Sequence, residues 1–252
     1  MPPVLEPDAK GLADRFSRTF GPENPVRVFV VALLAGYALL VTAMVFLGLV
    51  LIHVLLPIGG LGEADEEFSQ WLADNRSPAQ EDFSWIGSTL SGGHVIPAVI
   101  GICLVVFLIM RRWLLAAFVL FVVAVESGTY RATSLIVERE RPEVERLESL
   151  PVDASYPSGH TAAAVALYGG LLLLLASRFD SAVIRVGAVV LGVAIPLFVA
   201  WARMYRGMHH FSDVVAGLLM GLGALVILVF AARAARAAAE RRDGVPVGGD
   251  TA

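Results

Sequence analysis

The chain has 252 residues, of which 57% are hydrophobic and only 17% are charged, and its mean hydropathy is +0.72. This composition is typical of a helical integral membrane protein and excludes an ordinary soluble domain. The net charge of -4 argues against a nucleic-acid partner, and the single cysteine, Cys103, excludes an intrachain disulfide.

The N-terminal segment, residues 1–25, is polar and is predicted to be a partly disordered cytoplasmic tail. Six apolar stretches follow and are predicted to cross the membrane as helices. In chain order they are Val28–Leu56, His94–Met110, Trp113–Val137, Ser158–Ala176, Ala182–Trp201 and His209–Ala232. The predicted fold is therefore all-α with about six transmembrane helices, in which residues 26–232 form one domain and residues 233–252 a basic cytoplasmic tail.

Two connecting segments differ in composition from the apolar stretches. Residues 63–93 mix aromatic side chains with acids and amides, which predicts short amphipathic helices at the membrane surface. Residues 138–156 form an acidic loop, whose acids are Glu138, Glu140, Glu143, Glu145, Glu148 and Asp153. These acids either repel a multiply charged soluble substrate or form local pairs with arginines in a solvated loop, and the second interpretation is favoured.

The distribution of basic residues predicts the orientation, because cytoplasmic segments carry an excess of Lys and Arg. With six spans, both tails lie on the same side of the membrane. The basic residues on that side are Lys10, Arg15, Arg18, Arg27, Arg111, Arg112, Arg178, Arg185, Arg233, Arg236, Arg241 and Arg242. Those on the other side are fewer: Arg76, Arg131, Arg139, Arg141, Arg146, Arg203 and Arg206. The tails are therefore predicted to be cytoplasmic in a multi-pass protein of the cell membrane.

Three polar motifs interrupt the ends of the apolar stretches. They are Arg141-Pro142, Pro157-Ser158-Gly159-His160, and the segment from Arg203 to Asp213 that contains His209. The six-span topology places all three on the extracytoplasmic face. Arginine binds phosphate through a planar fork of donors, and histidine can attack phosphorus or transfer a proton near neutral pH. The pattern predicts one site on that face that handles a phosphate group.

The residues themselves indicate how a phosphate would be held. Arg141 and Arg203 supply bidentate donors to phosphate oxygens. Ser158 precedes an apolar helix and can cap it, so that its hydroxyl and the first backbone N–H groups, from Gly159 onward, face an anion. Asp213 lies one helical turn after His209 and can accept the second ring proton of that histidine.

The three motifs, in this order and spacing, resemble the signature of the type 2 phosphatidic acid phosphatase superfamily, which comprises membrane lipid phosphatases related to the vanadium haloperoxidases. The resemblance covers roughly Asp65 to Gly223. It implies that His209 is the nucleophile, His160 the general acid and Asp213 the orienting carboxylate. The implied intermediate is a phosphohistidine that water hydrolyses, and the resemblance implies neither a metal nor another cofactor.

This sequence departs from the family's first motif, which usually begins with a lysine seven residues before the arginine. Ser134 occupies that position here. One hypothesis is that Arg131, one turn earlier on the same helix, replaces the lysine, and the alternative is that Arg141 and Arg203 suffice. His210 is expected to be a surface residue.

Glu126, in the middle of a predicted span, is a pairing or functional residue by default. It either pairs with Arg131 or is a neutral, hydrogen-bonded group that holds helices together.

The predicted function is hydrolysis of a membrane lipid phosphate or diphosphate, with undecaprenyl diphosphate as the first candidate substrate. Phosphatidic acid and phosphatidylglycerol phosphate are alternatives, and a phosphohistidine can also pass its group to an alcohol, as in a phosphotransferase. A third class, non-catalytic lipid binding or transport, is disfavoured because His160, His209 and Asp213 are all present. The expected partners are the lipid substrate and the bilayer, and the sequence gives no indication of oligomeric state.

Overall fold

The structure, a computed structural model, describes residues 3–58, 60–149 and 154–248, and all regular secondary structure in these ranges is helical. Asp153 of the acidic loop lies outside the described residues. The long elements are α2 (Pro25–Val50), α6 (Trp113–Ser134), α9 (Ala182–Tyr205) and α10 (Phe211–Arg242). The shorter helices are η1 (Pro3–Leu5), α1 (Leu12–Phe20), α3 (Leu61–Asp74), α4 (Pro78–Leu90), α5 (Val95–Ile109), α7 (Gly159–Ala164) and α8 (Gly170–Arg178). Two π-helical turns, η2 (Leu51–Leu55) and η3 (Val165–Gly169), extend α2 and join α7 to α8.

The number of membrane spans agrees with the prediction of about six. Among the described residues, five helices are long and apolar enough to cross a bilayer: Pro25–Leu55, Trp113–Ser134, Gly159–Arg178, Ala182–Tyr205 and Phe211–Arg242. The expected second span, His94–Met110, is the 15-residue helix α5. It becomes a sixth span when it is joined to α4, from which it is bent by 45°.

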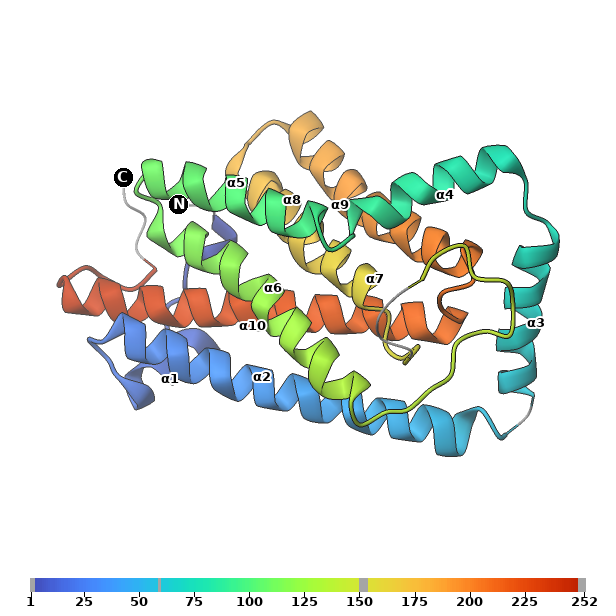
Figure 1. The fold of residues 1–252 in the computed structure, drawn as a ribbon. Helices are drawn as coiled ribbons and strands as arrows, with labels where there is room; N and C mark the ends of the chain where they lie inside the picture. The colour runs from blue at the N-terminus through green and yellow to red at the C-terminus, as the bar shows by residue number, and fades with distance from the viewer. Residues whose placement is uncertain (1–2, 59, 150–153, 249–252) are drawn as a thin grey trace.

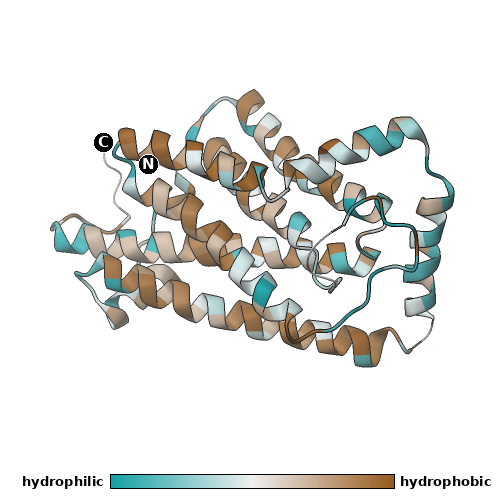
Figure 2. Ribbon diagram, in the orientation of Figure 1, coloured by the Kyte–Doolittle hydropathy of each residue, from teal (hydrophilic) through white to brown (hydrophobic). Residues whose placement is uncertain are grey.

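The helices α3 and α4 and the connecting loops gather at one end of the helix bundle. Figure 1 shows α3, α4 and the loop that follows α6 at this end, together with the start of α7 and the start of α10, whereas both chain termini lie at the opposite end. Figure 2 shows that the polar colour concentrates on α3 and the loop, while the middles of the helices are hydrophobic. The predicted short helices in residues 63–93 are confirmed as α3 and α4.

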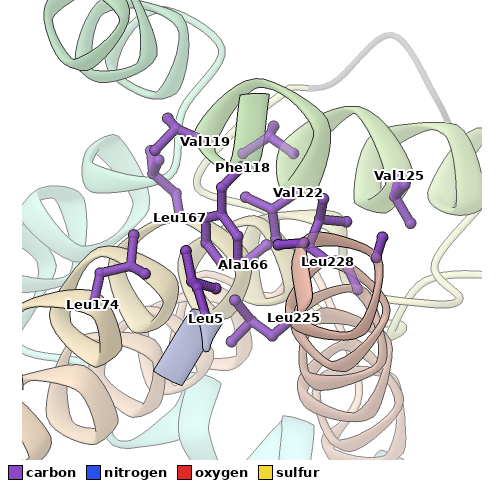
Figure 3. Close-up of a cluster of buried hydrophobic side chains, with 14 of the residues drawn as sticks. Leu5, Phe118, Val119, Val122, Val125, Ala166, Leu167, Leu174, Leu225 and Leu228 are labelled. Atoms are coloured by element: carbon purple, nitrogen blue, oxygen red, sulfur yellow. The ribbon is translucent and has the colours of Figure 1, made fainter. Parts of the chain in front are cut away.

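The core lies where α6, η3 and α10 meet. Phe118 and Val122 of α6 pack against Leu167, Leu225 and Leu228 in one buried cluster (Figure 3). In contrast, large apolar side chains of α2, α5 and α9 are exposed along the outside of the bundle. Lipid chains are as apolar as these side chains, so close packing and not exclusion of water must provide most of the helix association.

Small residues on α10 bring its backbone close to α7. A Cβ atom added to Gly217 would lie 2.5 Å from the backbone oxygen of Ser158, and one added to Gly221 would lie 2.6 Å from that of Ala162. Only glycine permits such an approach, as is common in membrane helix pairs. The two helices that carry the second and third motifs are therefore held together backbone to backbone.

The described part of the N-terminal segment contains helices that pack against α10. In the predicted disordered tail, η1 and α1 pack against α10, and Asp14 of α1 is buried in an ion pair with Arg241. Arg233 of α10 also donates to the backbone oxygen of Val4 at 2.9 Å. The helix α10 continues past the predicted end of the span at Ala232, and Arg233 and Arg241 in this extension find partners in the N-terminal segment.

Candidate active site

The three motifs meet at the end of the bundle that carries α3 and α4. Arg141 of the first motif donates to the backbone oxygen of Met208 in the third. The backbone N–H of Ser158 in the second motif donates to the backbone oxygen of Asp213 at 3.0 Å. Direct contacts therefore join the first motif to the third and the second to the third.

His209 is buried just before α10, and its ring is fixed by one hydrogen bond. Its Nδ1 lies 2.8 Å from the backbone oxygen of Ser155. A carbonyl oxygen can only accept, so Nδ1 must carry the proton, and Nε2 carries the lone pair. Burial and the nearby Arg203 guanidinium hold the pKa of His209 well below its ordinary value, which Asp213 only partly offsets. The ring is neutral at neutral pH and has an unprotonated nitrogen suited to nucleophilic attack.

Asp213 supports His209 indirectly, through Ser155. Its Oδ2 lies 4.0 Å from Nδ1 of His209, which is beyond hydrogen-bond distance. The same oxygen instead accepts from the hydroxyl of Ser155 at 2.5 Å and from the backbone N–H of His210 at 2.9 Å. Asp213 thus holds the residue whose carbonyl orients His209. The direct contact that the one-turn spacing predicted is replaced by this relay.

Arg139 joins this relay to the surface helix α3. Its guanidinium, 8% exposed as a residue, donates to Asp213, to the hydroxyl of Ser212 at 2.7 Å and to Asp65 at 2.7 Å. Asp65 also accepts from the Ser212 hydroxyl. The buried charges of Arg139, Asp213 and Asp65 are therefore paired, as buried charges must be to be tolerated.

Arg203 is fully buried, and two of its nitrogen atoms have no hydrogen-bond partner. Its Nη1 donates to the hydroxyl of Ser88 at 2.5 Å and to Glu148 at 2.6 Å. Its Nε and Nη2 are buried without a hydrogen-bond partner. Because an unmet buried donor on a charged group is costly, this side of the guanidinium is suited to receive an anion. Phosphate oxygens match its fork geometry.

The other predicted phosphate-binding residues lie beside this arginine. Arg141 is buried and also donates to the backbone oxygen of Ala154 at 3.1 Å. Ser158 occupies the N-cap position of α7, but its hydroxyl bonds to that of Thr161 at 2.9 Å and not to a backbone N–H, so the expected side-chain cap is absent. A Cβ atom on Gly159 would come within 3.1 Å of the Tyr130 ring, so the chain passes that ring closely.

His160 lies on α7 and lines a cavity. Its ring forms no hydrogen bond with the part of the chain that the structure describes. The cavity has a volume of about 530 Å³ and is bounded by α5, α6 and α7. Arg203 and Arg141 are close enough to act electrostatically on both His160 and His209. His160 lies on α7 and His209 just before α10, and the same pair of arginines acts on both.

One residue, His210, does not lie where the sequence placed it, and a second, Arg131, is exposed. His210 was predicted to be a surface residue, but it is buried, with Nδ1 3.3 Å from Asp213 and Nε2 3.1 Å from Glu66 of α3. Arg131, the hypothetical substitute for the missing lysine, is exposed on the last turn of α6 and has no ion pair with a described residue. Ser134 donates to the backbone oxygen of Arg131 at 3.2 Å.

Sequence reasoning missed the residues that support the motifs: Asp65, Ser88, Arg139, Glu148 and Ser155. Three of them, Arg139, Glu148 and Ser155, lie in the loop between α6 and α7. Arg139 precedes Arg141 by two residues and Ser155 precedes Pro157 by two, so proximity to a motif was a usable signal. No such signal marked Asp65 or Ser88, because they come from surface helices that are distant in sequence.

Comparison with known proteins places this geometry in context. A model of the PAP2 superfamily matches residues 115–237. An uncharacterized 22.5 kDa protein in the cps region of Klebsiella pneumoniae is 39% identical over 77 residues, which is 30% of this chain and 36% of that protein. An undecaprenyl-diphosphatase of Sulfolobus acidocaldarius is 39% identical over 75 residues, which is 30% of this chain and 32% of that protein. The chain thus spans about a third of the length of these curated relatives.

A solved structure shares the fold. It is the crystal structure of a transmembrane PAP2-type phosphatidylglycerolphosphate phosphatase from Bacillus subtilis, with a TM-score of 0.63 and 20% sequence identity over 81% of this chain and 94% of that one. The segment matched by the superfamily model contains all three motifs that meet at the site. The family named by this model, which matches residues 115–237, is the family that the three motifs resemble.

Proposed function

We propose that this chain is a membrane lipid phosphatase that hydrolyses a phosphomonoester or diphosphate lipid through a phosphohistidine on His209. The observation that carries the proposal is the buried fork of Arg203, with two unpartnered donors, next to a histidine whose Nε2 is unprotonated. An anion clamp beside a neutral nucleophile is the arrangement that phosphoryl transfer to histidine requires.

The proposed reaction has two steps. In the first, Nε2 of His209 forms a bond to phosphorus while the bond from phosphorus to the leaving oxygen breaks, and His160 donates a proton to that oxygen. Arg203 and Arg141 hold the phosphate oxygens, and Ser158 and Gly159 border them. In the second step, water attacks the phosphohistidine, gives a proton to His160 and releases phosphate. The hydrogen bond from Nδ1 to Ser155 stabilises the ring in both steps.

Undecaprenyl diphosphate is the first candidate substrate. Local similarity to an undecaprenyl-diphosphatase favours it, and the site opens toward helices with exposed apolar surfaces, as a lipid substrate requires. Phosphatidylglycerol phosphate is the second candidate, favoured by two unpartnered polar atoms, of Glu126 and Ser91, in the cavity beside His160. Transfer of the phosphoryl group to an alcohol would use the same first step.

The proposed location of the site is the extracytoplasmic face of the cell membrane. The site lies at the end of the bundle opposite the two termini (Figure 1), and the termini lie on the side richer in basic residues.

A direct test is phosphate release by the purified protein in detergent from a panel of lipid phosphates and diphosphates, with and without an alcohol acceptor. Vanadate, which mimics a five-coordinate phosphorus, should inhibit, and a chelator should not. Absence of phosphate release from every lipid in the panel would overturn the proposal. Phosphorylated alcohol in place of free phosphate would identify a transferase.

A further inference from the structure

The cavity that His160 lines extends along the bundle away from the acidic loop. Tyr130, Glu126 and Val123 of α6 line it at successive turns of that helix, as do residues of α5 from Ile96 to Leu104. Because an α-helix rises about 5.4 Å per turn, Glu126 lies about one turn deeper than Tyr130 and Val123 about one turn deeper again. The cavity therefore leads from the histidine to an apolar interior at membrane depth.

Two buried polar atoms line this cavity without a partner. One oxygen of Glu126, Oε2, accepts from the hydroxyl of Ser127 at 2.9 Å, but Oε1 has no hydrogen bond. The hydroxyl of Ser91, at the break between α4 and α5, also has none. Glu126 is 1% exposed and Ser91 5%. A buried polar group that lacks a partner is costly, and a carboxyl group at membrane depth is costlier still.

Neither expected role of Glu126 accounts for the unpartnered oxygen. No ion pair joins Glu126 to Arg131 among the described residues, and the side chain of Arg131 is exposed. A carboxyl group that only held helices together would bond across to a neighbouring helix, whereas the single bond of Glu126 goes to the next residue on its own helix. Oε1 therefore remains available to whatever enters the cavity.

We propose that Glu126 and Ser91 form a subsite for a hydroxyl group on the lipid side of the scissile bond, such as the free hydroxyl of a glycerol linker. This inference rests on the proposed phosphatase function and adds a preference among substrates. With the phosphate at Arg203 and the leaving oxygen at His160, the next atoms of the lipid enter the cavity at the level of Glu126. A hydroxyl there donates to Oε1 and exchanges a hydrogen bond with Ser91, while the apolar chain lies against residues such as Leu104 and Val123.

The proposed subsite distinguishes lipid substrates by whether they carry a hydroxyl group next to the scissile phosphate. Phosphatidylglycerol phosphate carries a hydroxyl on the glycerol next to the scissile phosphate. Phosphatidic acid carries only ester oxygens there, and a polyprenyl diphosphate carries a second phosphate. A site built to bond a hydroxyl rejects an analogue without it, because its own polar groups are then left unpaired.

The test measures kcat/KM for phosphatidylglycerol phosphate, phosphatidic acid with the same acyl chains, and undecaprenyl diphosphate. The wild-type protein should prefer the hydroxyl-bearing lipid over phosphatidic acid. Glu126→Leu and Ser91→Ala should each lower that ratio by about tenfold to a hundredfold, the range expected for one lost buried hydrogen bond. Glu126→Gln, which keeps an accepting oxygen, should retain most of the preference.

Thr129→Val provides the matched control. Thr129 is buried on α6 close to Glu126, but its hydroxyl bonds to the backbone oxygen of Val125 at 2.7 Å and does not line the cavity. Its substitution should leave the ratio unchanged. If Glu126→Leu does not fold, the smaller change at Ser91 carries the test.

The outcomes separate this inference from the proposed function. No preference in the wild-type protein, an equal loss on all three lipids, or exclusive use of the diphosphate would overturn the hydroxyl subsite and leave the phosphatase proposal intact. Failure of the wild-type protein to hydrolyse any of the three would count against the phosphatase proposal itself.

Discussion

One carboxylate oxygen of Glu148 lies 2.6 Å from Nη1 of Arg203, and the other is ion-paired with Arg206. The acidic loop therefore places a negative charge beside Arg203, the arginine that we propose binds phosphate. Burial raises the pKa of Glu148, but the Arg203 and Arg206 guanidinium groups outweigh that effect and hold the pKa below its ordinary value of 4.5. The carboxylate is thus fully charged at neutral pH.

Glu148→Gln should lower KM by roughly threefold to tenfold, equivalent to about 0.7–1.4 kcal/mol. The amide keeps a group that can bond to Arg203 and Ser88, but it removes a charge that repels the incoming phosphate. Because the folded-state pKa is lowered, the stabilising ion pairs are present above pH 4.5 and are lost only as the pH falls through the lower value. The difference in KM between the variant and the wild-type protein should therefore persist at pH 5. An unchanged or higher KM would show that Glu148 positions Arg203 and does not oppose substrate.

The two histidines should respond differently to the leaving group. His209→Ala should abolish turnover of every substrate, because no phosphohistidine can form. His160→Ala should lose at least a hundredfold on a lipid alcohol but much less on p-nitrophenyl phosphate, whose leaving group needs little protonation. Single-turnover trapping of labelled phosphohistidine would locate the covalent step. Near-normal phosphate release by His209→Ala would contradict the covalent mechanism.

The relay from Asp213 through Ser155 predicts a graded series. Ser155→Ala removes the hydroxyl that Asp213 accepts from but keeps the carbonyl that orients His209. It should lower kcat by about tenfold, in line with one lost hydrogen bond of about 1.4 kcal/mol, with little change in KM. Asp213→Asn should cost more, because it also disturbs the ion pair with Arg139. If Ser155→Ala had full activity and Asp213→Asn had none, the relay would be wrong.

Substitutions of Arg131 and Arg139 are expected to have different effects on kcat/KM and on stability. If Arg131 replaces the missing lysine, Arg131→Ala should lower kcat/KM by tenfold to a hundredfold, or about 1.4–2.8 kcal/mol. Because Arg131 is exposed in the structure, we instead expect kcat/KM to fall by less than threefold.

Arg139→Ala leaves two buried carboxylates unpaired and should lower the free energy of unfolding by about 3–5 kcal/mol. Thermal unfolding in detergent and kcat/KM, measured on both variants, distinguish these expectations. A large kinetic effect at Arg131 would restore its proposed role in phosphate binding.

Orientation can be tested with single cysteines in a Cys103→Ser background. Glu145 is exposed in the loop at the site, and Asp243 is exposed just after α10 at the opposite end. An impermeant thiol reagent applied to intact cells should label Glu145→Cys and not Asp243→Cys. Lysed cells, in which both should react, provide the control. Labelling of Asp243→Cys alone would place the site in the cytoplasm.

The sequence predicted the helical fold and the span positions well, because long apolar stretches have few alternatives in a membrane. It also placed His160, His209 and Arg203 at one end of the bundle, because those residues lie at predicted span ends. It could not predict the contacts of Asp213, because a one-turn spacing permits a direct bond to His209 but does not require one. It also could not predict that Arg139 is buried and Glu148 half-buried, since a charged loop has no periodicity that distinguishes inward from outward residues.

The glycine contacts between α7 and α10 bear on how the protein behaves in bilayers of different thickness. Helices that face lipid adjust to thickness by tilting, and α2, α5 and α9 present the exposed apolar surfaces on which lipid acts. The spacing of His160 and His209 is instead set by backbone contact at Gly217 and Gly221. The outer helices can therefore tilt while the distance between His160 and His209 stays the same. The rate of the reaction should then depend little on the thickness of the bilayer.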